Sequence, residues 1–212
     1  MNYFTADLHL SSIDFIRDWF LPFNDIDSYI STIIGNINKD CSKNDKLYVI
    51  GDFIRFLDKD SDPDYMQNLE LVRQLQPETY LVLGNNEQRL IESEFDNDYD
   101  GFMQVAVESG FKGVSKSLTM EMRGRAFDIV HNPEDAIGDL MTLHGHFHYM
   151  TAYTKVGLNV SIFQNWLRPM SEDMVFSRID DFYRYHQGYE FVYNQEFDHE
   201  FWRRYSKEGL KG

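Results

Sequence analysis

The stretch Gly145-His146-Phe147-His148 is the last of five short polar fragments spread along this chain. The four before it are Asp7-Leu8-His9, Gly51-Asp52, Gly84-Asn85-Asn86-Glu87 and His131-Asn132-Pro133. The fragments contain four of the seven histidines, each near a short acidic or turn-forming residue. Imidazole, carboxylate and amide groups together suit borderline and hard divalent ions. The fragments therefore predict a metal site assembled from residues far apart in the sequence.

The His-x-His pair formed by His146 and His148 carries the strongest single signal. In a continuous strand, the two rings would face opposite sides of the sheet. A turn after Gly145 would instead aim both rings at one point. The plain alternative is an ordinary strand with one histidine inside and one outside. The presence of the other fragments, in order, favours the turn.

Three of the polar fragments directly follow a predicted strand. Strands are expected at 2–6, 46–50 and 79–83, with helices between them at 25–38 and from Asp62-Pro63 to about Leu75. The second half predicts a helix at 100–108, then strands at 114–122, 126–131, 139–144 and 152–162, and an amphipathic helix from about Ser171.

In the first half of the chain, predicted strands alternate with helices, and the second half is rich in strands. This order predicts an α+β fold whose first half resembles an α/β protein. We expect a four-layer α-β-β-α sandwich, in which two mixed sheets pack together and helices flank them. Strand ends gathered at one rim would bring the polar fragments into one place. The sequence has no internal repeat or linker, so residues 1–212 are predicted to form one domain, with the aromatic C-terminal tail 188–212 packed on it.

The composition restricts the class of partner. The chain has 35 acidic and 20 basic residues, a formal net charge of −15, and no lysine or arginine cluster that would build a basic groove. We therefore expect neither non-specific nucleic-acid binding nor attachment to an anionic membrane. The single cysteine, Cys41, fits a reducing compartment. No apolar run approaches the ~20 residues of a membrane span, and Asp7 leaves no room for a cleaved signal, so a cytoplasmic protein is predicted.

The five fragments resemble the pattern of the calcineurin-like metallophosphoesterases, which is D-x-H, G-D, G-N-H-[D/E], H and G-H-x-H. The resemblance covers about residues 1–171, because the run from Asn159 to Ser171 is similar to one in the small bacterial and phage-type members, with departures at Ser161 and Phe163. It implies two divalent metal ions, with manganese first among Mn, Fe, Zn and Ni. The ligands implied for the first ion are Asp7, His9, Asp52 and His148. Those implied for the second are Asp52 as a bridge, Asn85, His131 and His146.

The resemblance also implies a reaction. Two cations that share a bridging water lower its pKa and polarise the phosphoryl oxygens for in-line attack. Most members protonate the leaving oxygen with a histidine at the position of Asn86, paired with the acid that follows, here Glu87. Asparagine cannot release a proton near neutral pH, and general acid catalysis typically contributes ~10²–10⁴-fold. We therefore expect Asn86 to retain metal binding and hydrolysis but to narrow the range of substrates.

Arg89 completes the candidate catalytic residues, beside Asn86 and Glu87. It matches an arginine of the protein-phosphatase branch, and it could clamp phosphate or pair with an acid such as Glu87. Arg55 lies near the position of a second arginine of that branch, but no aspartate precedes it here as it does there. This difference argues against a protein phosphatase. His144, which precedes Gly145, is interpreted as a packing residue rather than a ligand.

The sequence thus predicts a hydrolase, a metal-dependent phosphoesterase that acts on a small phosphodiester or nucleotide-like substrate. One alternative is a non-catalytic protein-binding module of the same fold, as the retromer scaffold subunit has become. Another is a nuclease-type end processor, which would need a cationic track that this chain does not show. The aromatic tail is expected to close the core, although it could also form a homodimer surface or stack on bases.

Overall fold

The computed structural model describes residues 1–58, 60 and 64–185, with side chains as far as residue 181. The helix start predicted at Asp62-Pro63 and the aromatic tail at 188–212 lie outside the described residues. The extent of the single domain therefore stays a prediction.

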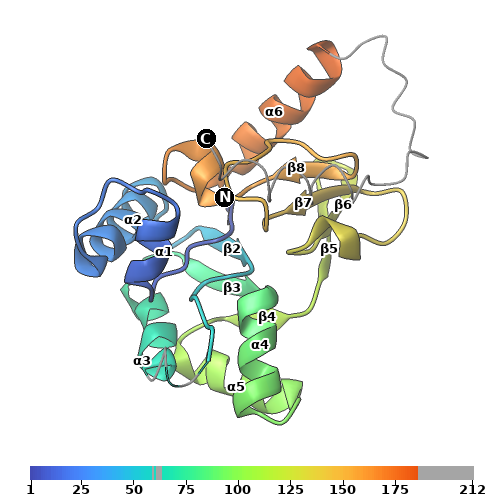
Figure 1. Cartoon of the computed structure of the whole chain (residues 1–212). Coiled ribbons are helices and arrows are strands. Elements are labelled where there is room, and N and C mark those ends of the chain that lie inside the picture. The colour runs from blue at the N-terminus through green and yellow to red at the C-terminus, as the bar shows by residue number, and fades with distance from the viewer. Residues whose placement is uncertain (59, 61–63, 186–212) are drawn as a thin grey trace, which may run out of the picture.

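A five-stranded sheet lies at the centre of the molecule (Figure 1). Its strands are β1 (Asn2–Thr5), β2 (Lys46–Ile50), β3 (Glu78–Val82), β4 (Gly113–Ser115) and β9 (Met170–Ser171), in the order β4-β3-β2-β1-β9. The first four are parallel, and β9 is antiparallel to β1. The register pairs Thr5 with Val49 and Ile50 with Val82, so the carboxyl ends of β1, β2 and β3 lie level at one rim.

A second, four-stranded sheet supplies the other half of the sandwich. It contains β5 (Leu118–Met122), β6 (Arg125–Ile129), β7 (Met141–His144) and β8 (Gly157–Asn159), in that order. The β5–β6 pair is antiparallel, and β6, β7 and β8 are parallel. An isolated parallel bridge between Ala6 and Ser161 joins the carboxyl end of β1 to the residues just after β8. The two sheets therefore meet at the rim where the polar fragments leave their strands.

Helices flank the sheets. They are α1 (Ile13–Asp18), α2 (Ile26–Asp40), α3 (Tyr65–Leu69), α4 (Asn85–Glu94), α5 (Tyr99–Ser109) and α6 (Glu172–Tyr185), with short 3-10 helices η1 (Glu70–Gln74), η2 (Pro133–Asp135) and η3 (Ile162–Asn165). The first five α-helices bury their apolar residues against one face of the five-stranded sheet. Through Val175, Phe176 and Ile179, α6 joins the second core cluster, and it lies beside β9 and β1.

Both faces of the five-stranded sheet are buried, as the alternation along β2 illustrates. Leu47 and Val49 belong to the cluster beneath the helices, whereas Tyr48 and Ile50 belong to the cluster shared with the second sheet. A strand buried on both faces has a nearly continuous apolar sequence, which β2 has. The predicted α+β sandwich of two mixed sheets with flanking helices is confirmed.

Several predicted element boundaries are wrong. Residues 114–122 form two strands in different sheets, because the chain crosses from β4 to β5 at Lys116-Ser117. The strand predicted at 152–162 is reduced to Gly157–Asn159 and is followed by η3. The helix predicted to reach Leu75 becomes 3-10 at Glu70. Helices α1 and α4 were not predicted.

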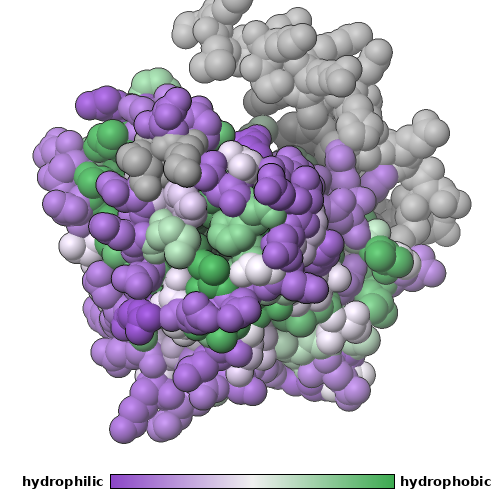
Figure 2. Space-filling view, turned by 90° about the horizontal axis from the view of Figure 1, so that it is seen from below, coloured by the Kyte–Doolittle hydropathy of each residue, from purple (hydrophilic) through white to green (hydrophobic). Residues whose placement is uncertain are grey.

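The surface is largely hydrophilic. Figure 2, which views the molecule from below, shows hydrophilic residues over most of this face, with hydrophobic residues at its centre and in smaller groups near its edges. Within the described residues, no helix combines the length and the apolar character that crossing a membrane would require.

One contact ties the helical layer to the first polar fragment. The buried Tyr29 of α2 donates its hydroxyl hydrogen bond to the carbonyl of Leu8, at 2.9 Å. Leu8 stands between Asp7 and His9, so this bond fixes the backbone that carries both side chains.

We predict that Tyr29→Phe lowers the free energy of unfolding by ~1–3 kcal/mol, because the buried Leu8 carbonyl loses its partner. Denaturant unfolding of the metal-free protein measures this. Tyr80→Phe is the matched control, because the Tyr80 hydroxyl has no hydrogen bond to any described residue. Equal losses in the two variants would contradict the prediction.

Candidate metal centre

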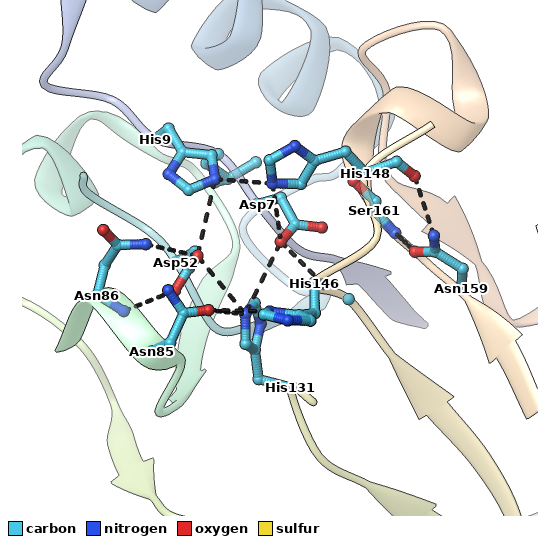
Figure 3. Close-up of polar contacts among 12 residues, drawn as sticks. Asp7, His9, Asp52, Asn85, Asn86, His131, His146, His148, Asn159 and Ser161 are labelled. Carbon is cyan, nitrogen blue, oxygen red and sulfur yellow. Dashed lines mark hydrogen bonds and ion pairs between the residues drawn. The ribbon is translucent and has the colours of Figure 1, made fainter. Parts of the chain in front are cut away.

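The predicted metal ligands all lie just beyond the carboxyl ends of strands. They follow β1, β2, β3, β6 and β7, and are, in that order, Asp7 with His9, Asp52, Asn85, His131, and His146 with His148. Because the strand ends of both sheets meet at one rim, seven side chains from five segments converge there. Figure 3 shows them pointing toward a common centre.

Asp7, His9 and His148 form one group that could hold a cation. All three are buried, and Asp7 is 0% exposed. The Nε2 atoms of His9 and His148 lie 3.2 Å apart, and His148 Nε2 lies 3.7 Å from Asp7 Oδ1. One oxygen and two imidazole nitrogens thus face the same small volume.

Asp7, Asp52 and His131 form a second group. His131 Nε2 lies 3.5 Å from Asp52 Oδ2 and 4.0 Å from Asp7 Oδ1. Asp52 Oδ2 is also 3.7 Å from His9 Nε2, so this carboxylate stands between the two groups. Asp7 belongs to both groups, and Asp52 is the second carboxylate that lies near residues of each.

Asn85 extends the second group. Its Oδ1 lies 3.0 Å from His131 Nε2 and 2.9 Å from His146 Nδ1. On the opposite side of its ring, His131 Nδ1 lies 2.8 Å from the Ile50 carbonyl, which can accept a hydrogen bond and leave Nε2 aimed at the centre. Metal-bound histidines typically use their second nitrogen in this way.

Unsatisfied atoms test whether divalent ions fit here. Among the described residues, Asp7 Oδ2, His9 Nδ1 and His148 Nδ1 are buried without a hydrogen-bond partner. The two unpaired nitrogens lie across each ring from Nε2, which is the atom that faces the cluster, so the unpaired atom that bears on an ion is Asp7 Oδ2. A buried carboxylate oxygen is normally paired, and its lack of a partner here is consistent with a bound cation. The donor set of carboxylate, imidazole and amide oxygen suits divalent ions such as Mn or Zn. The residues present fit such ions.

The backbone at these positions is strained. Asp7, His9, Asp52, His146 and His148 have φ angles of 60°, 46°, 56°, 73° and 47°. This left-handed region is uncommon for residues other than glycine, and each case costs on the order of 1–3 kcal/mol. Such strain persists only where the surroundings determine it, and it gathers at functional sites. Because His146 and His148 both lie beyond β7 in this conformation, the alternative of an ordinary strand is excluded.

Two glycines allow the fragments to approach one another closely. A Cβ atom at Gly51, where φ is 80°, would lie 2.3 Å from His131 Nδ1. At Gly145 a Cβ atom would lie 2.5 Å from that of Ala6 and 3.1 Å from Asp7 Oδ2. Side chains at either position would push a predicted ligand out of the cluster.

The electrostatics of the second group are dominated by Asp52 and His131. Burial alone would lower the pKa of His131, but the Asp52 carboxylate, which also hydrogen-bonds it, and then Asp7 outweigh burial and raise that pKa to about 10. Burial alone would raise the pKa of Asp52, but His131 and then His9 hold it below its usual range. In the metal-free protein His131 is therefore a cation beside an ionised Asp52.

The first group lacks such a cation. Burial lowers the pKa of His9 and of His148 to about 4 in each case, against the opposing effect of the nearby aspartates. Burial likewise raises the pKa of Asp7. At neutral pH both rings are neutral, which is the form of imidazole that binds a metal.

Of the predicted catalytic residues, Asn86 and Glu87 are buried, whereas Arg89 is exposed on α4. Asn86 donates from Nδ2 to Asp52 Oδ2 at 2.6 Å and accepts from the Phe56 N–H at 3.1 Å. Asn86 thereby orients the carboxylate that stands between the two groups. None of these contacts gives Asn86 a proton to release.

Glu87 has a structural role that the sequence analysis missed. Its carboxylate accepts hydrogen bonds from the N–H groups of Asp52, Phe53 and Gly84 at 2.9, 2.9 and 2.8 Å. It caps the start of α4 and simultaneously fixes the Asp52 loop. The pairing with Arg89 that the sequence left open is therefore not what holds this carboxylate. The spacing of three residues between Gly84 and Glu87, typical of a helix start, was the available signal.

Asn159 was another missed determinant. Its Nδ2 donates to the carbonyls of His148 and Thr151 at 2.9 and 2.8 Å, and its Oδ1 accepts from the Ser161 N–H (Figure 3). Gln164 also donates to the His148 carbonyl, at 2.7 Å. The Asn159 run thus holds the His148 loop in place, and the departure at Ser161 leaves this contact intact.

His144 has the packing role that was expected. The ring is buried, its Nδ1 lies 3.0 Å from the Gly145 carbonyl and its Nε2 lies 3.0 Å from the Thr154 hydroxyl. It supports the turn that begins at Gly145 and points neither nitrogen at the cluster.

Comparison with known proteins places the fold. No family model matches the chain. An uncharacterized protein of Methanocaldococcus jannaschii is 24% identical over 188 residues, which covers 84% of this chain and 90% of that protein. The crystal structure of a protein of unknown function from Aquifex aeolicus matches with a TM-score of 0.57 and 20% identity, over 86% of this chain and 98% of that one. This likeness shows a shared fold. An archaeal phosphodiesterase structure matches with a TM-score of 0.43 and 13% identity, over 76% of this chain and 82% of that one.

We predict that Glu87→Gln lowers the free energy of unfolding by ~2–5 kcal/mol, because the amide has one acceptor oxygen for three buried N–H groups. The same variant should bind divalent ions more weakly, since the Asp52 loop loses its anchor. Chemical denaturation and calorimetric metal titration measure the two effects. Glu92→Gln, an exposed change on the same helix, should shift stability by less than ~0.5 kcal/mol.

We also predict that metal binding near pH 7 releases about one proton, because His131 must give up the proton on Nε2 to act as a ligand. With its pKa raised to about 10, the ring is protonated below that pH, so the release should persist at pH 7 and vanish as the pH rises through 10. Calorimetry in buffers of different ionisation enthalpy counts the proton. Release that stays near zero at pH 7 would show that the His131 ring is already neutral.

Proposed function

We propose that this protein is a metal-dependent phosphoesterase that hydrolyses a small phosphodiester or nucleotide-like substrate in the cytoplasm. The observation that carries the proposal is the convergence of seven candidate ligands: two groups that share Asp7 and also contain His9, His148, Asp52 and His131, with Asn85 and His146 beside His131. Asp52 lies within 3.7 Å of His9 in the other group. The buried, unpaired Asp7 oxygen supports the same proposal.

The candidate ligands divide into two sets. Asp7, His9 and His148 would hold one ion, and Asn85, His131 and His146 the other, with Asp52 in reach of both. When bound, two such ions, of which manganese is the first candidate, would activate water and neutralise phosphoryl oxygens. The protein's own contribution is to hold these ligands rigidly, through Glu87 on the Asp52 loop and Asn159 on the His148 loop.

Asn86 shapes the choice of substrate. It is buried, and its amide is engaged by Asp52 and the Phe56 N–H, so it orients the bridging carboxylate and supplies no proton to a leaving group. Phosphodiesters with alcohol groups that leave without a strong acid are the substrates that such a site serves best.

The decisive experiment measures metal content and activity together. The purified protein, loaded with Mn, should hydrolyse bis(4-nitrophenyl) phosphate faster than 4-nitrophenyl phosphate. Asp52→Asn should lose at least ~10²-fold in kcat, because one carboxylate serves both ions. Asp100→Asn, an exposed change on α5, is the control and should keep full activity. Metal content near zero together with no hydrolysis would instead favour a non-catalytic binding module.

A second variant tests the role of Asn86. Asn86→His should raise kcat on esters with unactivated alcohols by ~10-fold or more, since part of the missing acid catalysis is restored. Bis(4-nitrophenyl) phosphate should gain little, because its leaving group needs no proton. An unchanged rate on the unactivated ester, in a variant that still binds metal, would contradict this role.

A further inference from the structure

A cavity of about 310 Å³ adjoins the candidate metal centre on the side of His131. It is lined by Leu83, Gly84, Gln88, Tyr99, Lys116, Ser117, Val130, His131 and Asp135. Gly84 and His131 belong to the polar fragments, and the residue after Gly84 is Asn85, whose Oδ1 lies 3.0 Å from His131 Nε2. A group attached to a phosphorus atom at the metal centre can therefore extend into this cavity.

Lys116 gives the cavity its cationic wall. It lies at the crossing from β4 to β5, and its Nζ stands 3.5 Å from the centre of the Tyr99 ring, a cation–π contact. In the part of the chain that the structure describes, no carboxylate forms an ion pair with this lysine. The ring holds the ammonium at the wall while some of its donor hydrogens stay free.

The cavity also contains a negative charge. Asp135 of η2 lines the same cavity, so the formal charges of Lys116 and Asp135 cancel. Gln88 and Ser117 add groups that both donate and accept, above a floor made by the buried Leu83 and Val130. A second anionic group on the ligand would be repelled by the Asp135 carboxylate. Hydroxyl groups on the ligand can instead accept hydrogen bonds from the donors of the cavity and donate to its acceptors.

The volume limits the size of the ligand. Pockets for small molecules typically measure ~300–1,000 Å³, so this one accommodates a single small ring rather than an extended chain. A larger cavity of about 620 Å³, lined by residues that include Tyr3, Asp40 and Arg168, contains none of the predicted metal ligands.

We propose that the cavity beside His131 binds the hydroxylated, uncharged alcohol group of the substrate, such as a sugar, with Lys116 and Asp135 as specificity-determining residues. This inference rests on the proposed phosphoesterase function. It makes the substrate an ester of a polyol. The ammonium of Lys116 donates to hydroxyl oxygens, and the carboxylate of Asp135 accepts from hydroxyl hydrogens.

Two diesters with the same leaving group test the inference. They are the 4-nitrophenyl diesters of glucose 6-phosphate and of cyclohexylmethyl phosphate, which share a six-membered ring and differ chiefly in ring hydroxyls. The metal-loaded protein should show at least a tenfold higher kcat/KM for the glucose diester. Lys116→Gln and Asp135→Asn should each reduce the ratio of kcat/KM for the glucose diester to kcat/KM for the cyclohexylmethyl diester several-fold. Lys112→Gln and Asp139→Asn, exposed changes outside the cavity, should leave the ratio unaltered.

The outcomes separate the two proposals. A ratio near one in the unaltered protein, or no change in either cavity variant, overturns the polyol inference. A lower glucose-diester rate with Lys116→Gln but a higher one with Asp135→Asn also overturns it, because that pattern indicates an anionic ligand. If neither diester is hydrolysed, the phosphoesterase function fails instead. Calorimetric affinities of metal-loaded protein for glucose 6-phosphate and cyclohexylmethyl phosphate then still test the cavity, and equal affinities would refute the polyol site.

Discussion

Two buried carboxylates in one small volume are the constraint on which the rest of this structure depends. Asp7 and Asp52 are 0% and 2% exposed, and both approach His131 Nε2. Ionised groups without water are costly unless opposite charge lies close. Among the histidines of the cluster, His131 carries that charge in the metal-free protein, while burial keeps His9 and His148 neutral. One imidazolium cannot balance two carboxylates, and burial, followed by the nearby Asp52 carboxylate, raises the pKa of Asp7 against the opposing effect of the histidines. Divalent cations would supply the missing positive charge.

Holding this cluster together strains the backbone, and hydrogen bonds from rigid elements oppose that strain. Tyr29 on α2 fixes Leu8, Glu87 on α4 fixes the Asp52 loop, and Asn159 at the end of β8 fixes the His148 loop. Each donor or acceptor reaches the backbone of a ligand fragment rather than the ligand side chain. The imidazole nitrogens therefore remain free to face the centre. A site supported in this way is pre-organised for its ligand.

The sequence revealed the polar fragments because each ligand follows the end of a strand, and both signals are local. The strands at 46–50 and 79–83, for example, were predicted almost to the residue. The crossing at Lys116-Ser117 was missed because residues on either side of it resemble strand, and periodicity does not reveal a change of sheet. The backbone contacts of Glu87 and Asn159 were not predicted, for a related reason. Their partners lie in other fragments, so their roles exist only after the chain has folded.

On the proposed function, Asn86 connects the candidate metal centre to the adjoining cavity. An asparagine at this position steadies the Asp52 carboxylate, with its Nδ2 2.6 Å from Oδ2, and so supports the ligand that both candidate ions would share. An amide at this position cannot release a proton to a poor leaving group. On the proposed function, the protein would then select substrates by binding particular alcohol groups, since no acid is present to protonate every leaving group. On the proposed function, such a group would lie in the cavity between Lys116 and His131, so the absence of an acid at Asn86 and the charge-balanced pocket would together select the substrate.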